Sequence, residues 1–449
     1  MKVLFNPAKP FFYLLVYMVV IYLRPQEYLP SFQELPVIPI TMAAAGGAWL
    51  LMQRKTFDAP HHGLLPCLLL VMMISLVAAG WVGGAVAAAN DFIPTMVLFY
   101  VLSTSVDDLD RFRVVGWVLT ATAVVLSLHG VDQAFNPEGI GWTGAKMVDN
   151  RITYIGLLND PNDLSMALLI ALPFSFYLFN TSHSFLARLI YLTSAGTIIY
   201  GVYLCNSRGA VLGLLAMMGA ASARRYGWSR TLAVLPVLAA AVLVFGPNRA
   251  GDLSTDEESA AGRIDAWYEG FGMFRAHPVF GVGKGLFTEH NNLTAHNSYV
   301  LAIAELGVVG YFVWFSFFVL AGVILYRLLR QPNPDQEPTT QPGAVEAGQT
   351  ATEGANGDAL PWSDLQSAVW TVAYAFIGAM LTAFFLSRSY IIFMYVPVAL
   401  LVALYQMARE HWPSIEAVRF ADFRGRLVAY ELASILFLWI LTLVLLRMG

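Results

Sequence analysis

The sequence predicts an all-α, polytopic integral membrane protein with about 12 to 13 transmembrane helices. Of its 449 residues, 57% are hydrophobic and only 12% are charged, and the mean hydropathy is positive. This composition is typical of multi-pass membrane proteins. Apolar runs suited to a hydrocarbon core of about 30 Å recur along the chain. We therefore expect residues 1–449 to form a single membrane domain, without a separate soluble catalytic domain.

The apolar runs, a few of them short or interrupted, define the expected helices. They are 9–23, 36–53, 62–80, 84–103, 111–131, 162–180, 185–204, 208–223, 230–246, 297–329, 365–386, 389–406 and 428–447. The first run is followed by Arg24-Pro25-Gln26 instead of a small-residue cleavage site, so we expect it to be a retained membrane helix. Cys67 and Cys205 fall in or beside apolar runs, which indicates neither a disulfide framework nor a metal cluster.

The distribution of lysine and arginine predicts the orientation. Short cytoplasmic loops carry an excess of these residues, and a cytoplasmic N terminus places most of the 26 on that side. We therefore predict a multi-pass protein of the bacterial inner membrane with its N terminus in the cytoplasm. The other basic residues cluster around two external loops, and a basic cluster on that face indicates an anionic partner.

The connecting segments differ in composition. The expected external loops are 132–161 and 247–296, and the second carries acidic residues around positions 252–258. These carboxylates are sequential rather than convergent, so we interpret them as a solvated surface and predict no metal site. Residues 331–364 are rich in Pro, Gly, Thr, Gln and Ala, and we expect a disordered cytoplasmic linker.

The first candidate site is the motif His296-Asn297-Ser298, followed by Gly307 and Gly310. It places a titratable ring at the mouth of an apolar run. In a continuous helix, the histidine and both glycines would lie along one stripe. The glycines would then let a neighbouring helix approach closely. Proton transfer by His296 and a histidine that merely caps a helix at the membrane surface both fit this pattern.

Three further segments bring arginine to the same external face. They are Asn206-Ser207-Arg208-Gly209, Gly262-Arg263-Ile264-Asp265-Ala266-Trp267 and Ser387-Arg388-Ser389-Tyr390. A single arginine at a helix end could simply extend to the membrane surface. Three segments that converge on one face favour an anionic ligand instead.

Two other motifs lie near these segments. The glycine-rich run Gly281-Val282-Gly283-Lys284-Gly285 is expected to be a tight loop. It is not a phosphate-binding loop, since Pro278 and Gly285 occupy positions that require glycine and Ser or Thr. In the polar stretch before residue 164, Asp160 and Asn162 can cap a helix, with Pro161 in its first turn. The same pattern fits a side chain that faces the site equally well.

Together, these residues resemble a known family. His296-Asn297, separated by nine residues from Gly307 and then Gly310, resembles the signature of the O-antigen ligase family. Ser207-Arg208-Gly209, Asp160-Pro161-Asn162, the Gly262-Arg263 segment leading to Pro278 and Gly281, and Arg388 after a membrane helix also fit. The resemblance spans roughly residues 155–405. The thirteen runs depart from the twelve helices associated with the ligases.

The resemblance implies a GT-C-like membrane glycosyltransferase. Such an enzyme transfers a polysaccharide from undecaprenyl diphosphate to a hydroxyl of lipid A core at the periplasmic face. His296 would be the base, and Arg208 and Arg263 would act on the diphosphate. The expected substrate-binding residues are Arg388, Tyr390, Asn297, Lys284, Asn206, Asp160 and Asn162. We expect an inverting, metal-independent reaction without a cofactor, with donor, acceptor and membrane lipid as partners and no nucleic acid.

The residue types suit this chemistry independently. Arginine stays charged and offers forked donors to phosphate oxygens, and histidine titrates near pH 6.5. An O-antigen polymerase or a protein O-oligosaccharyltransferase would use the same donor, so the sequence leaves the acceptor open. A transporter of lipid-linked sugar is the alternative from another class. It would be expected to carry charges at the bilayer midplane and an internal repeat. Most of the runs instead have uninterrupted apolar centres, and the sequence shows no internal repeat.

Overall fold

The computed structural model describes residues 10–233, 253–333 and 360–448. Over these residues the chain is helical, and extended pairing is limited to two isolated bridges, Ile140 with Lys146 and Val148 with Arg151. The α-helices are α1 Pro10–Leu23, α2 Val37–Leu50, α3 His61–Ala78, α4 Val82–Ser105, α5 Leu109–Phe135, α6 Pro161–Thr181, α7 Phe185–Leu204, α8 Arg208–Tyr226, α10 Leu253–Ala276, α11 Phe287–His290, α12 Ser298–Arg330, α13 Trp362–Ala383, α14 Ile392–His411 and α15 Phe420–Met448.

Nine helices within the described residues are long and apolar enough to cross a membrane. The predicted all-α, polytopic membrane class is therefore confirmed, whereas the predicted 12 to 13 crossings are not. Helices α1 and α2 have 14 residues each, which corresponds to about 21 Å of helix against a hydrocarbon core of about 30 Å. Helix α8 carries three arginines and is less apolar. Most of the run at 230–246 lies outside the described residues.

Short polar side chains define where several helices begin. Asp108, Asp160, Ser184, Ser207 and Asn297 precede α5, α6, α7, α8 and α12, and each accepts a hydrogen bond from a backbone N–H of the first turn. These bonds satisfy donors that have no partner within the helix. The predicted capping role of Asp160, with Pro161 in the first turn, is confirmed.

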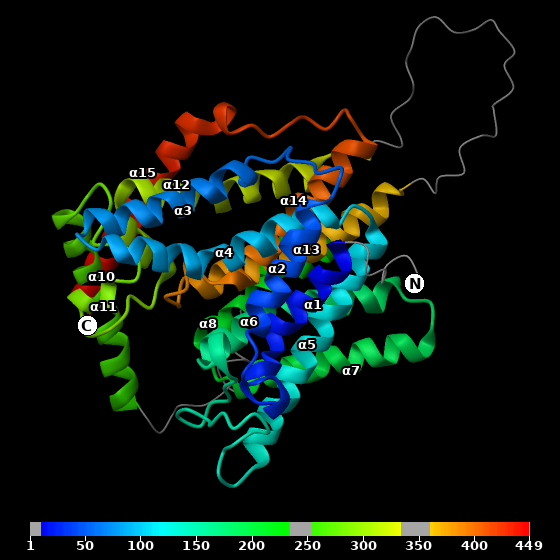
Figure 1. Ribbon diagram of the computed structural model, residues 1–449, viewed down its shortest axis with the longest axis horizontal. Coiled ribbons are helices and arrows are strands. Elements are labelled where there is room, and N and C mark those ends of the chain that lie inside the picture. Colours follow the sequence, from blue (N-terminus) through cyan, green and yellow to red (C-terminus); the bar gives the residue numbers. More distant parts are fainter. Residues whose placement is uncertain (1–9, 234–252, 334–359, 449) are drawn as a thin grey trace, which may run out of the picture.

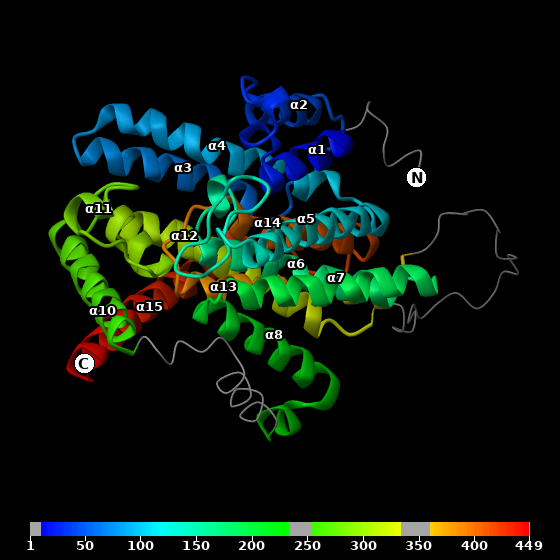
Figure 2. The same cartoon turned by 90° about the horizontal axis from the view of Figure 1, so that it is seen from below.

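The helices form a layered bundle. Helices α3, α4 and α12 run side by side, and α14 packs against α4 and α13 (Figure 1). Helix α10 lies steeply across the ends of α3 and α12 and contacts α12 and α15 (Figure 2). Helix α14 is almost completely enclosed by its neighbours. The candidate residues are therefore positioned mainly by helix ends. These are the ends of α5, α7, α10 and α13 and the starts of α6, α8, α12 and α14.

Two predicted connecting segments are more ordered than expected. Residues 262–267, which were expected within the external loop 247–296, belong to the 24-residue helix α10. Helix α13 begins at Trp362, so the last residues of the predicted 331–364 linker are helical. Residues 334–359 of that linker lie outside the described residues.

Helix α12 is broken at Gly307, whose φ of 62° and ψ of −167° are not helical. Residues 278–283 insert at the break. Val282 N donates to Ala304 O at 3.0 Å and Gly283 N to Glu305 O at 3.0 Å. In return, Val308 N donates to Pro278 O at 2.8 Å and Val309 N to Val279 O at 3.2 Å. The loop thus replaces two successive helix hydrogen bonds, so the two carbonyls and the two N–H groups that these bonds would have joined keep partners.

Glycine is required at this crossing. A Cβ on Gly307 would lie 2.5 Å from the carbonyl carbon of Val279, and one on Gly281 would lie 2.3 Å from that of Glu305. The predicted stripe of His296, Gly307 and Gly310 along one continuous helix is therefore wrong. His296 precedes the helix, and Gly307 meets a loop. Gly310 does allow close packing, because a Cβ there would lie 2.9 Å from Val71 of α3.

Candidate active site

The connection between α13 and α14 holds the start of α12. His296 N donates to Ser387 Oγ at 2.6 Å, and Ser298 Oγ donates to Leu386 O at 2.6 Å. Ser389 Oγ donates to Ser298 O at 2.6 Å. Residues 296–298 and 386–389 thus form one hydrogen-bonded unit, although about 90 residues separate them in the sequence.

His296 itself adopts a left-handed backbone conformation, with φ at 48°. A non-glycine residue rarely adopts this conformation, and such strained positions concentrate at functional sites. The hydrogen bond to Ser387 and the Asn297 cap hold the strained residue in place. Its side chain is partly buried.

The electrostatic surroundings of His296 favour its neutral form. Burial lowers the pKa of the imidazole below its usual value, and the positive charges of Arg263 and Arg388 lower it further. The carboxylate of Asp160 acts in the opposite direction. The net decrease leaves the ring unprotonated at neutral pH, so it can accept a proton. Because the charges of Arg263, Arg388 and Asp160 act on this pKa, all three residues lie near the histidine.

Arg388 is anchored by Asp163, in the first turn of α6. Arg388 Nη2 lies 2.6 Å from Asp163 Oδ2, and Arg388 Nε donates to both carboxylate oxygens at 2.7 Å. Only 1% of the Asp163 side chain is exposed, compared with 44% of the Arg388 side chain. The ion pair therefore fixes one edge of the guanidinium and leaves the side chain accessible. Asp163 was not among the predicted site residues, although a carboxylate beside an apolar run indicates a partner.

The polar residues before α6 have separate roles. Asp160 Oδ1 accepts from Asn162 N at 2.7 Å, as a capping side chain does. Asn162 Oδ1 instead accepts from Arg151 Nη2 at 2.7 Å, and Arg151 Nε donates to Cys205 O at 2.9 Å. Arg151 thereby ties the start of α6 to the end of α7. It belongs to the external basic residues that the sequence indicated, but it was not among the predicted site residues.

Arg208 lies at the first position of α8, directly after the Ser207 cap. Asn206, which precedes the cap, has a φ of 46° and turns the chain between α7 and α8. A Cβ on Gly209 would lie 3.0 Å from Phe385 Cβ, so the first turn of α8 packs against the α13–α14 connection. Arg208 is exposed there. The structure thus brings Arg208 to the segment that carries Arg388.

Arg263 reaches the same region from α10. Trp267, four residues further along this helix, packs edge-on against Phe384 with ring centroids 5.6 Å apart. Residues four apart share one face of a helix, so Arg263 and Trp267 both face this side. Three separate elements thus carry Arg208, Arg263 and Arg388 to positions around the α13–α14 connection. Their role at the site stays a prediction.

Asn297, Tyr390 and Lys284, which were also predicted, are buried or bound to other parts of the protein. Asn297 is fully buried and caps α12, with Oδ1 accepting from Tyr299 N at 2.9 Å. The Tyr390 hydroxyl is buried, and burial followed by the nearby Glu305 carboxyl raises its pKa well above the usual value. Lys284 Nζ forms an ion pair with Asp91 of α4 at 2.8 Å. Their positions do not indicate that these three residues contact the substrate.

Metal-binding groups do not converge in the part of the chain that the structure describes. No three His, Cys, Asp or Glu side chains within it are arranged to hold an ion. The charged groups at the site are mainly guanidiniums, which bind anions. The predicted independence from metal stays a prediction, and it can be tested by metal removal.

Sequence comparison matches part of this region to a known family. A profile of the O-antigen ligase family matches residues 193–315. The matched region includes Arg208, Arg263 and His296, whereas Asp163 and Arg388 lie outside it. No curated protein matches the chain. The predicted resemblance is confirmed over residues 193–315. The chain is therefore a multi-pass helical membrane protein that carries a domain of the O-antigen ligase family.

Proposed function

We propose that this protein transfers a glycan from undecaprenyl diphosphate to a hydroxyl of lipid A core at the periplasmic face of the bacterial inner membrane. The observation that carries the proposal is the neutral His296 with Arg263 and Arg388 near it, within or beside the O-antigen ligase match. Arg208 starts α8, which packs against the connection that carries Arg388. A proton acceptor and a diphosphate-binding surface are the two parts that such a transfer requires.

The reaction is proposed as a single displacement. The acceptor oxygen attacks the anomeric carbon and its proton passes to the imidazole of His296. The bond from that carbon to the diphosphate oxygen breaks, and its electron pair leaves with the lipid diphosphate. Attack opposite the leaving group inverts the anomeric centre. The lowered pKa of His296 keeps the ring ready to accept the proton.

Arg208, Arg263 and Arg388 are proposed to bind the diphosphate. Each charge-assisted hydrogen bond contributes about 1.5 to 3 kcal/mol. Its contribution grows as negative charge develops on the departing oxygen, because the donors are already oriented. The anchoring of Arg388 by Asp163 supports this role, since it restricts the guanidinium before substrate binds. Three guanidiniums would supply the charge that a divalent cation supplies in other glycan transferases.

The acceptor distinguishes lipid A core ligation from the related reactions. An O-antigen polymerase would use a second lipid-linked repeat unit, and a protein O-oligosaccharyltransferase would use a hydroxyl side chain. All three share the donor chemistry proposed for His296 and the arginines. The ligase is preferred because the matched profile is that of the O-antigen ligase family.

The test is the lipopolysaccharide profile of a deletion strain that produces the His296→Asn variant. Asparagine tolerates the left-handed backbone of position 296 but supplies no base. We expect unmodified lipid A core together with accumulated lipid-linked polysaccharide. The matched control is His290→Asn, at an exposed position of α11, which should restore the wild-type profile. Normal ligation by His296→Asn would refute the general base. Single repeat units on the core, or a defect confined to glycoproteins, would refute the ligase assignment.

A further inference from the structure

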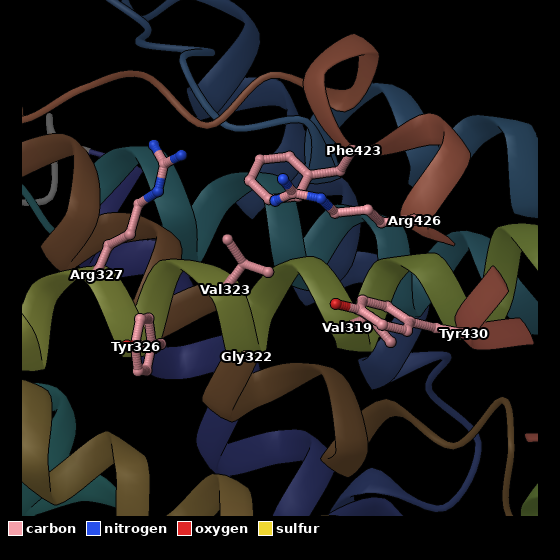
Figure 3. A pocket seen from close by; sticks show the side chains of 8 residues that line it. All are labelled: Val319, Gly322, Val323, Tyr326, Arg327, Phe423, Arg426 and Tyr430. Carbon is pink, nitrogen blue, oxygen red and sulfur yellow. The ribbon is translucent and has the colours of Figure 1, made fainter. Parts of the chain in front are cut away.

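A groove lies between α12 and α15, at the opposite end of α12 from His296. Arg327 is 29 residues beyond Ser298, about 40 Å along the helix. The groove has a volume of about 420 Å³ and opens to the outside of the bundle. Val319, Gly322 and Val323 of α12 and Tyr430 of α15 form its apolar part, while Arg327 and Arg426 extend at its edge (Figure 3).

Gly322 leaves the base of the groove open. No atom lies within 4 Å of the place where a Cβ would stand on this residue. The glycines at 281 and 307, by contrast, are in close contact with backbone atoms. Gly322 therefore does not serve close helix packing. It leaves an elongated apolar space between two helices that are each long enough to span a membrane.

Two positive charges flank one aromatic ring at the edge of this space. Arg327 Cζ lies 5.5 Å and Arg426 Cζ 6.0 Å from the centroid of the Phe423 ring. Such cation–π contacts orient both guanidiniums but do not neutralise them. Because the two cations share one ring, an anion between them would relieve their mutual repulsion.

Carboxylates neutralise little of the positive charge of Arg327 and Arg426. The ion pair of Arg327 with Glu416 is long, at 3.9 Å, and 87% of the Glu416 side chain is exposed. Within the described ranges, no carboxylate oxygen lies within 4.0 Å of the Arg426 guanidinium. The edge of the groove therefore attracts an anion, and its interior suits a hydrocarbon chain.

We propose that this groove binds an anionic phospholipid. The phosphate lies between Arg327 and Arg426, and one acyl chain extends past Gly322 toward Val319 and Tyr430. Both parts of the groove are needed, because the arginines select the negative headgroup and the open base accommodates the chain. The lysine and arginine distribution predicts that this is the cytoplasmic end, where anionic lipid is abundant. The site is separate from the proposed transferase site and does not depend on it.

The experiment is native mass spectrometry of the full-length protein, titrated with phosphatidylglycerol and, separately, with phosphatidylcholine. We expect one phosphatidylglycerol molecule to bind more tightly than the others. Arg327→Gln and Arg426→Gln should each weaken this binding about fivefold, which is the contribution of one basic residue near an anionic membrane surface. Gly322→Leu, which fills the base and keeps both charges, should abolish the tight binding.

The matched control is Arg188→Gln. Arg188 also stacks on one phenylalanine, Phe179, at 4.5 Å, but no second arginine among the described residues shares that ring. This variant should bind phosphatidylglycerol as the wild type does. The proposal is overturned if Arg188→Gln has the same effect, if Gly322→Leu binds normally, or if phosphatidylcholine binds equally well. It is also overturned if Gly322→Leu converts a dimer to a monomer, because the groove would then be occupied by a second copy of the chain.

Discussion

Arg388 and Asp163, 225 residues apart in the sequence, form an ion pair in which Nη2 and Oδ2 are 2.6 Å apart. Asp163 is buried in the first turn of α6, while the Arg388 side chain is partly exposed. The carboxylate therefore acts as a fixed support for a guanidinium that faces the site. It joins the start of α6 to the α13–α14 connection that also positions His296.

Asp163→Asn should weaken donor binding without removing the base. The neutral amide cannot hold the guanidinium, and the loss of one charge-assisted contact corresponds to about a tenfold to hundredfold increase in the donor KM. Adding Arg388→Gln should cause little further loss of donor binding, because both changes disrupt the same ion pair. Asp58→Asn, which breaks the Arg409–Asp58 pair elsewhere, is the control. Additive losses in steady-state kinetics with purified donor would contradict the positioning role.

The pH dependence of transfer should report the titration of His296. Because burial, followed by the charge of Arg263, lowers its pKa, activity should decrease only at a pH below that at which a solvent-exposed histidine becomes protonated. Arg263→Gln removes a positive charge and should raise this pKa, so the acidic limb of kcat should move to higher pH. An unchanged limb in this variant would show that another group controls the profile.

Gly307→Ala should destabilise the protein, whereas Gly322→Ala should not. Both residues belong to α12, but at Gly307 the backbone is left-handed and a Cβ would overlap Val279. The backbone conformation alone costs about 1 to 3 kcal/mol for a non-glycine residue. At Gly322 the Cβ meets open space. Thermal unfolding in detergent should show a clear decrease for the first variant only. Equal transition temperatures would mean that the loop crossing does not require glycine.

Removal of divalent cations should leave transfer unchanged. The proposed site uses Arg208, Arg263 and Arg388 to bind the diphosphate, so it needs no bridging ion. Initial rates measured with and without a chelator compare the two conditions directly. A decrease that is reversed by added Mg²⁺ or Mn²⁺ would assign the diphosphate charge to a metal instead.

Local patterns in the sequence predicted much of the architecture. Apolar runs identified the helices, and Asp160 with Pro161 identified the start of α6, because caps and hydrophobic length are properties of neighbouring residues. The convergence of Arg208, Arg263 and Arg388 followed from alternating the direction of successive helices. The number of crossings did not follow, since α1 and α2 are apolar but, at 14 residues each, too short to meet the length expected of a span.

The finer geometry depends on contacts between distant residues. Lys284 pairs with Asp91, and Ser387 binds the backbone of His296, yet no periodicity connects these positions. The break at Gly307 is a further case, because its hydrogen-bond partners belong to a loop about 25 residues earlier. A glycine in an apolar run is compatible with packing or with a break. The inserted loop, residues 278–283, shows that Gly307 marks a break.

The break in α12 also gives the histidine an attachment that a continuous helix would lack. A membrane helix adjusts to a thinner or thicker bilayer by tilting. Residues 278–283 form hydrogen bonds with turns on both sides of the break, and Ser387 binds the backbone of His296. Two other segments of the chain therefore resist any tilt of α12 that would move the imidazole with it.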